Sequence, residues 1–186
     1  MKLETERLIL RQWQDDDLDP FTRINRDPLI MEYFPRPLDK KATEKLVKRF
    51  QAHFKKYGYG FYAIELKESG DFIGFVGLGN VEIDVPFKPA VEFAWRLDYS
   101  HWGKGYATEA ALAVANHAFT TLELKELVAY TVFDNVRSIH VMEKLGMKLD
   151  KKGDFHYPGF SKDSPLAKHV LFRMKAQDFQ KAEKAA

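Results

Sequence analysis

The chain has 186 residues, 45% of them hydrophobic and none of them cysteine, and its 29 basic and 27 acidic side chains give a formal net charge of +2. A chain of this length buries a full core without disulfides, so we expect one domain over residues 1–178 and a frayed tail over residues 179–186. The near-neutral charge and the lack of any apolar run of roughly 20 residues predict a cytoplasmic protein with no nucleic-acid or membrane partner.

The first third of the chain shows a strand pattern followed by a helix pattern. Residues 7–13 place Leu8 and Leu10 on one face of a short strand, and a polar stretch then opens a helical region. Residues 39–57 carry four large apolar side chains at helical spacing with lysines opposite them, which predicts an amphipathic helix. We interpret these lysines as a solvated surface, and a nucleic-acid face is the alternative.

Further along, strand-like runs alternate with helix-like ones, and no repeat or linker interrupts the order. Two runs flank the short glycine-containing loop at residues 67–70, which predicts an antiparallel hairpin. The predicted elements after residue 59 are strands at 60–66, 71–83 and 91–97, a helix at 109–119, a strand at 126–133, a helix at 135–147 ended by Gly146, and a strand at 169–174. This order favours a mixed sheet with helices on its faces.

Residues 102–108 read WGKGYAT and lie between a strand that ends at Leu97 and a helix that begins near Ala107. Glycine permits positive φ and close approach of a ligand, while free N–H groups and the helix dipole face an anion. This geometry favours a phosphate site, and an ordinary glycine-containing turn is the alternative. The GxxxxGK[ST] loop is absent, and GxGxxG fails because Thr108 occupies the third glycine position.

The stretches EFAWRLDYSHWGKGYATEA and NVRSIHVMEKLGM resemble the GNAT superfamily of acyl-CoA-dependent N-acyltransferases. The likeness is closest to the ribosomal-protein N-terminal (serine/alanine) acetyltransferase branch, and it spans the chain from ETERLILR to the final strand. It implies an α+β fold with three α/β/α layers, in which a mixed, mostly antiparallel central sheet carries helices on both faces. It also implies acetyl-CoA as cosubstrate and an amine as acceptor.

In that family the Q/R-x-x-G-x-G/A turn binds the coenzyme A pyrophosphate through backbone amides. The corresponding residues are Trp102, Gly103, Lys104, Gly105, Tyr106 and Ala107. Trp102 departs from the family's Gln or Arg, which leaves main-chain binding intact and puts a side-chain role there in question.

The resemblance also gives the preceding strand a role, because the family leaves its main chain free to pair with the pantetheine arm. By position these residues are Trp95, Arg96 and Leu97, and the Leu97 N–H would stabilise the oxyanion that develops on attack. A fully paired core strand is the alternative.

The chemistry requires an amine that has lost its proton. An α-amine is about 14% neutral at pH 7 and a lysine only about 0.04%, so a protein N-terminus demands less of a base. Since the chain has no cysteine, direct attack of the amine on bound acetyl-CoA is the natural mechanism. Glu92 is the candidate base, and a strand glutamate in a surface ion pair is the alternative.

A tyrosine in N-x-x-A-x-x-x-Y often assists the departing thiolate in the superfamily. Here the pattern falls on Asn135, Ser138 and Met142, and methionine has no proton to donate. We expect Ser138 to hydrogen-bond the sulfur and Asn135 to hydrogen-bond the pantetheine arm. The alternative is that Asn135 caps the helix and Ser138 lies within its first turn.

The six histidines form no H-E-x-x-H or comparable cluster, and we predict no metal. The family's acceptor walls correspond to MEYFPRP and DFHYPGF, where Tyr33, Phe34 and Tyr157 either line the amine side or cover the core. A small amine as acceptor, a non-catalytic coenzyme A sensor and a ribosome-binding module remain open alternatives, as do a monomer and a homodimer.

Overall fold

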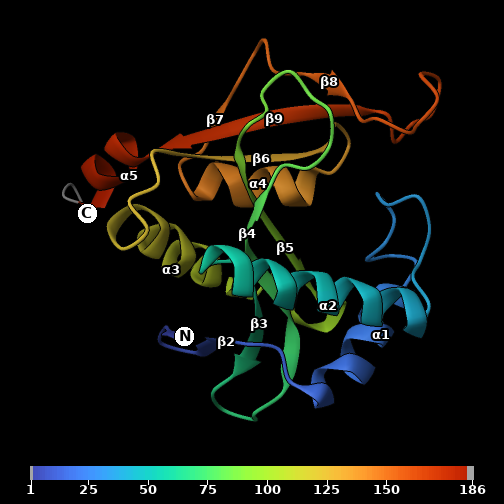
Figure 1. The fold of residues 1–186 in the computed structure, drawn as a ribbon, viewed down its shortest axis with the longest axis vertical. Coiled ribbons are helices and arrows are strands. Elements are labelled where there is room, and N and C mark those ends of the chain that lie inside the picture. Colours follow the sequence, from blue (N-terminus) through green and yellow to red (C-terminus); the bar gives the residue numbers. More distant parts are fainter. Residues whose placement is uncertain (1, 184–186) are drawn as a thin grey trace. The chain divides into compact units, whose positions relative to one another are not determined.

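The computed structural model describes residues 2–183, with the side chains of residues 2–179. The described chain divides into two compact units. Unit 1 comprises Met1–Gly79 and Ala94–Ala115, and unit 2 comprises Asn80–Phe93 and Asn116–Ala186. Three elements contribute residues to both units (Figure 1): strands β4 (Phe72–Asn80) and β5 (Val91–Leu97) and helix α3 (Tyr106–Thr120). That residues 1–178 form one domain stays a prediction.

Unit 1 contains a series of antiparallel strands that pair in chain order. These are β1 (Leu3–Glu4), β2 (Leu8–Arg11), β3 (Phe61–Leu66) and the unit 1 part of β4. Leu8 and Leu10 are both fully buried, as the alternation of the first strand predicts. The pairing of β3 with β4 confirms the predicted hairpin.

Helices α1 (Leu18–Arg26) and α2 (Lys40–Tyr57) complete the first part of unit 1 (Figure 1). The α2 helix begins at Asp39, whose carboxylate accepts a hydrogen bond from the Ala42 amide at 2.7 Å. It ends at Gly58, which adopts a left-handed φ of 77°. The helix pattern of residues 39–57 is therefore confirmed.

An aromatic core joins these helices to the strands of unit 1. Trp13, Phe21, Phe50 and Phe75 are all buried, and the Trp13 indole donates a hydrogen bond to the Phe61 carbonyl at 2.8 Å. Their rings meet in tilted and edge-on pairs, with 4.9 Å between the centroids of Trp13 and Phe21. Burying each such side chain stabilises the fold by about 1.5–3 kcal/mol, so this cluster holds α1 and α2 against the strands.

Unit 2 is built around a long antiparallel pair, β6 (Glu126–Val132) with β9 (Lys168–Lys175). The short strands β7 (Lys148–Leu149) and β8 (Phe155–His156) also pair with β9. Strand β5 enters this unit through Val91–Phe93, where Glu92 lies opposite Val128 in a parallel pair. Helix α4 (Val136–Lys144) follows β6 as predicted, and Gly146 has the left-handed φ expected after a helix.

The last helix of the chain, α5 (Ala176–Glu183), overlaps the predicted tail of residues 179–186. That this tail is frayed stays a prediction. Phe179 is only 6% exposed, and its ring lies 5.3 Å from that of Phe119, which anchors the helix. The remainder of the predicted tail, residues 184–186, lies outside the described residues.

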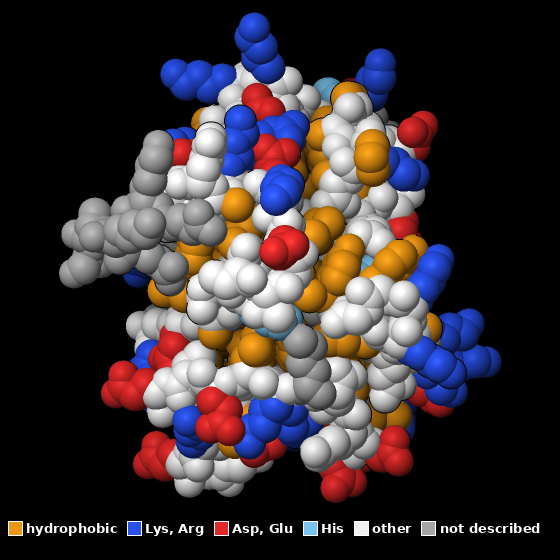
Figure 2. Space-filling model, turned by 60° about the vertical axis from the view of Figure 1, so that its left-hand side comes forward, with side chains coloured by type: hydrophobic (Ala, Val, Ile, Leu, Met, Phe, Trp, Pro, Cys, Tyr) orange, Lys and Arg blue, Asp and Glu red, His pale blue; other side chains and the backbone are white. Residues whose placement is uncertain are grey.

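The pairings within the units are antiparallel except for β5 with β6, which confirms the predicted α+β class and the mixed, mostly antiparallel sheet. Basic and acidic side chains are interspersed over the face drawn in Figure 2, as expected for a near-neutral chain. Over residues 2–183, no helix combines the length and the apolar character needed to cross a membrane.

Candidate active site

The glycine turn, residues 103–105, lies in unit 1 directly before α3. Gly103 and Gly105 have φ values of 74° and 83°, a region that favours glycine. A Cβ atom added at Gly103 would meet no heavy atom within 4 Å, so the turn presents its backbone to open space. Because α3 begins at Tyr106 and is 15 residues long, the turn also lies at the positive end of a helix dipole.

A network from the segment between β1 and β2 holds this turn. Arg7 Nε donates to Glu109 Oε2 at 2.7 Å, and Arg7 Nη1 donates to the Lys104 carbonyl at 3.0 Å. Glu109 Oε1 accepts from the Thr5 hydroxyl at 2.6 Å and from the Arg7 amide at 2.9 Å. The Arg7 guanidinium also lies 4.5 Å from the centroid of the Tyr106 ring. We call Thr5, Arg7 and Glu109 the N-terminal clamp.

The Glu109 carboxylate of the clamp is ionised at neutral pH. Burial would raise the pKa of Glu109, but the hydrogen bonds from Thr5 and Arg7 outweigh it and leave that pKa below its ordinary value. Sequence analysis missed these residues because Arg7 and Glu109 are 102 residues apart and no local pattern connects them.

Trp102 ties the turn to the end of β5. Its indole Nε1 donates to the Leu97 carbonyl at 3.0 Å, and its ring packs against the aromatic core of unit 1. The edge of the indole also meets the ring of Tyr99, with centroids 5.2 Å apart. The side chain that departs from the family pattern therefore has a structural role.

The main chain of β5 is closely approached by β4 within unit 1. Gly74 of β4 has a φ of 142°, and a Cβ there would lie 2.1 Å from the Arg96 carbonyl oxygen. Only glycine permits this approach. The main-chain role of Trp95, Arg96 and Leu97 toward a cofactor stays a prediction.

In unit 2, Glu92 has a specific partner. The Tyr130 hydroxyl donates a hydrogen bond to the Glu92 carboxylate. Tyr130 follows Val128, the register partner of Glu92, by two residues and therefore lies on the same face of β6. Its ring packs among aromatic side chains, including Phe155 at 5.5 Å and Tyr157 at 6.4 Å between centroids. The predicted acceptor residue Tyr157 is thus part of the unit 2 core cluster.

The start of α4 confirms the capping interpretation of Asn135. Its Oδ1 accepts from the Ser138 amide at 3.2 Å, and its Nδ2 donates to Thr131 Oγ1 at 2.9 Å. Ser138 is half-buried, and its hydroxyl has no hydrogen-bond partner among the described residues. Met142 is 1% exposed, so the position of the family's tyrosine faces the core here. The cofactor contacts of Asn135 and Ser138 stay predictions.

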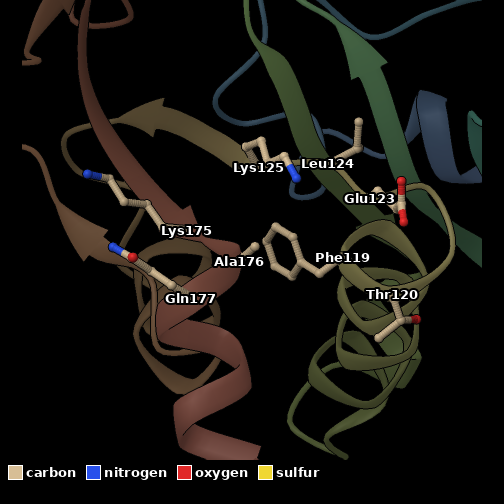
Figure 3. Close-up of a pocket in the computed structure, with 8 residues that line it drawn as sticks. All are labelled: Phe119, Thr120, Glu123, Leu124, Lys125, Lys175, Ala176 and Gln177. Carbon is tan, nitrogen blue, oxygen red and sulfur yellow. The ribbon is translucent and has the colours of Figure 1, made fainter.

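A hollow of about 730 Å³ opens in unit 2 between the end of α3 and the start of α5 (Figure 3). Phe119 points toward Ala176 in it, and Lys125 and Lys175 lie along its edge. None of the predicted site residues lines this hollow.

The histidines take structural or surface positions. Among residues 2–179, no group of three or more His, Asp or Glu side chains could hold a metal ion. His101 is partly exposed, and its Nδ1 lies 2.9 Å from the Ser100 hydroxyl. His117 and His169 are each 7% exposed, and desolvation lowers the pKa of both.

A family model described as an acetyltransferase (GNAT) domain matches residues 7–148. The chain therefore belongs to the GNAT acetyltransferase family, whose members use acetyl-CoA, and it is an acetyltransferase. Membership favours the enzyme over the non-catalytic sensor.

Relatives and solved structures agree with this assignment. The chain is 33% identical over 151 residues to the uncharacterized protein YkkB of Bacillus subtilis, covering 81% of this chain and 87% of YkkB. It is 28% identical over 142 residues to spermidine N(1)-acetyltransferase of Escherichia coli, covering 76% and 73%. An acetyltransferase from Agrobacterium tumefaciens superposes with a TM-score of 0.76 at 30% identity, covering 94% of each chain. RimL, a ribosomal L7/L12 α-N-protein acetyltransferase in complex with coenzyme A, superposes with a TM-score of 0.76 at 16% identity, covering 94% and 98%, which supports the fold.

Proposed function

We propose that this acetyltransferase moves the acetyl group of acetyl-CoA to a primary amine, the α-amine of a protein N-terminus, by direct attack in a ternary complex. The glycine turn is the observation that carries the proposal. It combines two positive-φ glycines, open space at Gly103 and the start of a long helix. The backbone amides there would bind the pyrophosphate, with main-chain contacts from Trp102 to Ala107.

The proposed reaction needs no covalent enzyme intermediate. The amine nitrogen attacks the thioester carbonyl carbon, a C–N bond forms as the C–S bond breaks, and coenzyme A leaves as a thiolate. Glu92 is the proposed acceptor of the amine proton, and the Leu97 N–H is the proposed donor to the oxyanion. Ser138 is the proposed hydrogen-bond donor to the departing sulfur, and Asn135 the proposed contact of the pantetheine arm.

A polyamine is the second candidate acceptor, because one relative of this chain is named spermidine N(1)-acetyltransferase. Incubation of the purified protein with acetyl-CoA and a panel of N-terminal peptides, amino acids and polyamines, with mass detection, separates these classes. We expect peptide α-amines to be acetylated with the highest kcat/KM. Preferential acetylation of spermidine would show that the acceptor is a polyamine and not a protein α-amine. If no amine is acetylated, the proposed function is refuted.

The cofactor site is tested by a matched pair of glycine variants. Gly103 and Gly58 have φ values of 74° and 77°, and a Cβ at either position meets nothing within 4 Å. Gly103→Ala and Gly58→Ala therefore impose the same backbone strain, but only the first places a methyl group where the pyrophosphate would lie. We expect Gly103→Ala to lower acetyl-CoA affinity at least about tenfold, since hydrogen bonds to charged groups contribute about 1.5–3 kcal/mol each. If calorimetry gives the Gly103→Ala and Gly58→Ala variants equal affinities for acetyl-CoA, the cofactor does not bind at this turn.

A further inference from the structure

The guanidinium of Arg96, in the unit 1 part of β5, has an unusual set of neighbours. Its Nη1 donates to Asn25 Oδ1 at 2.6 Å, a neutral partner. The charge centre lies 4.2 Å from the centroid of the Phe34 ring and 5.5 Å from that of Phe75. Its Nε is buried without any hydrogen-bond partner. No carboxylate pairs with this guanidinium among the described residues.

Other partly buried arginines of the chain differ in this respect. Arg11 forms ion pairs with Asp17 and Glu65, and Arg173 forms ion pairs with Asp150 and Glu126. Their charges are compensated inside the fold.

The charge of Arg96 is costly in its present surroundings. Burial lowers the pKa of its guanidinium to about 10, so the side chain still carries its charge at neutral pH. A buried charge without a paired anion is destabilising, since neither the amide of Asn25 nor an aromatic face replaces the lost hydration. An anion that binds there would gain a partner already stripped of water.

The surroundings hold the guanidinium in one orientation. Asn25 is fully buried, and its Nδ2 donates to Thr43 Oγ1 at 3.1 Å, which turns Oδ1 toward Arg96. Nη1 is thereby occupied, while the edge formed by Nε and Nη2 makes no hydrogen bond among the described residues. That edge is a two-donor fork that matches the two oxygens of a carboxylate.

A ligand can approach this edge past Phe34. Phe75 is 5% exposed, whereas Phe34, whose ring lies closer to the guanidinium, is 40% exposed. Phe34 belongs to the segment MEYFPRP, which corresponds by family resemblance to a wall of the acceptor side. The main chain of Arg96 lies in the stretch proposed to hold the thioester, so an anion on its side chain would sit beside the reacting group.

We propose that Arg96 binds a carboxylate of the acceptor, so that the acceptor class is an amine that also carries an acid. This inference rests on the proposed function and narrows its substrate. The carboxylate comes either from a free amino acid or from an acidic side chain close to a peptide N-terminus. A polyamine, which carries only positive charges near its amines, is disfavoured beside an uncompensated guanidinium.

The test compares acid and amide forms of the same acceptor. Initial rates with saturating acetyl-CoA are measured for peptides with Asp or Asn at the second position, for free amino acids and their amides, and for spermidine. We expect the acid form to exceed its amide in kcat/KM by about 10- to 100-fold in the peptide or the amino-acid arm, the range of a hydrogen bond to a charged group. The arm that shows the ratio identifies the source of the carboxylate.

Three variants test whether Arg96 causes the acid-to-amide ratio. Arg96→Gln should reduce it to near one, whereas Arg49→Gln, which removes an exposed charge on α2, should leave it unchanged. Asn25→Asp keeps Arg96 but supplies an internal carboxylate at the Nη1 contact. It should therefore also remove the preference for acid acceptors and raise the thermal midpoint. A purely structural Arg96 would lower the thermal midpoint when replaced and leave the ratio unaltered.

The outcomes separate this inference from the proposed function. If no amine is acetylated, the proposed function fails. If amines are acetylated and every acid-to-amide ratio lies within about twofold of one, or if Asn25→Asp leaves a large ratio intact, only the role of Arg96 is overturned.

Discussion

Tyr130 and Glu92 pair a phenol with a carboxylate across β5 and β6. A hydrogen bond of this kind fixes the orientation of the carboxylate. A carboxylate held in this way is well placed to receive the proton of an attacking amine. The pair thus gives the proposed base a defined geometry that a solvated strand glutamate lacks.

The first prediction concerns this pair. Glu92→Gln preserves volume and removes the charge, so turnover should fall about 10²- to 10⁴-fold at neutral pH, the usual range of general-base assistance. The loss should shrink as pH rises, because the amine then deprotonates without help. Tyr130→Phe should cost less, and the double variant should resemble Glu92→Gln alone, since the two side chains act as one unit. An unchanged pH–rate profile in Glu92→Gln would return Glu92 to a structural role.

The second prediction concerns the departing sulfur. Ser138→Ala removes a hydroxyl that has no partner among the described residues, and Asn135 still caps α4 through the main-chain amide. Turnover should fall at least about tenfold with little change in acetyl-CoA affinity, because the bond strengthens only as charge develops on sulfur. Steady-state kinetics and calorimetry on the same samples measure the two quantities. Full turnover would exclude Ser138 and direct attention to Tyr130.

At the scale of elements, the N-terminal clamp connects the β1–β2 segment to the start of α3. Our third prediction is that Arg7→Lys, which retains the charge but loses the two-donor geometry, lowers acetyl-CoA affinity about three- to tenfold. Unfolding free energy should change by less than about 1 kcal/mol, since the Arg7 side chain is 43% exposed.

Lys40→Ala is the control for the clamp. Lys40 forms an exposed ion pair with Asp19 at 2.7 Å in the same unit, so this variant removes a comparable surface contact away from the turn. Equal affinities of Arg7→Lys and Lys40→Ala for acetyl-CoA would show that the clamp does not position the turn.

Sequence periodicity predicted those helices and strands whose hydrophobic residues follow a regular spacing. The helix of residues 39–57, the β3–β4 hairpin and the strands β6 and β9 all follow from alternation or helical spacing. The two-residue strands β7 and β8 were missed, because they exist only where β9 offers them a neighbour. Helix α5 was missed because its anchor, Phe179 on Phe119, is a contact between distant residues.

The candidate site likewise contains one part that the sequence predicted and one part that it did not. A local motif marks the glycine turn, and both of its glycines adopt the positive φ that the motif requires. The partners that orient the site, Arg7, Tyr130 and Asn25, come from segments far along the chain from the groups they hold. No spacing rule connects such residues, so only the folded chain reveals them.

At the scale of the whole molecule, we expect two buried histidines, His117 and His169, to make stability depend on pH. Desolvation lowers the pKa of His117 and of His169, in the second case against a hydrogen bond to the Ala167 carbonyl. The unfolded chain, with a histidine pKa near 6.5, therefore binds more protons than the native chain as pH falls. The stability that these neutral histidines contribute is present in full above about pH 6.5. It is lost as the pH drops toward their folded-state pKa values.

The fourth prediction concerns this loss of stability at low pH. The urea midpoint should be constant between about pH 7 and pH 8 and should decline as the pH falls below about 6.5 toward the lowered folded-state pKa values. His117→Leu combined with His169→Gln should flatten this decline, whereas the exposed His156→Gln should not. A decline that persists in the double variant would assign the acid sensitivity to other groups.

Because of the N-terminal clamp, amide exchange near the start of the chain can report whether a ligand occupies the glycine turn. The Arg7 amide is bonded to Glu109 at 2.9 Å, and the Leu8 amide to the Thr5 hydroxyl at 3.0 Å, so both exchange with solvent only when the clamp opens. A ligand that tightens the glycine turn, whose Lys104 is 97 residues from Arg7 in sequence, would slow deuterium uptake at these two amides. Occupancy of the turn is then readable by mass spectrometry of a single N-terminal peptide, without any label on the ligand.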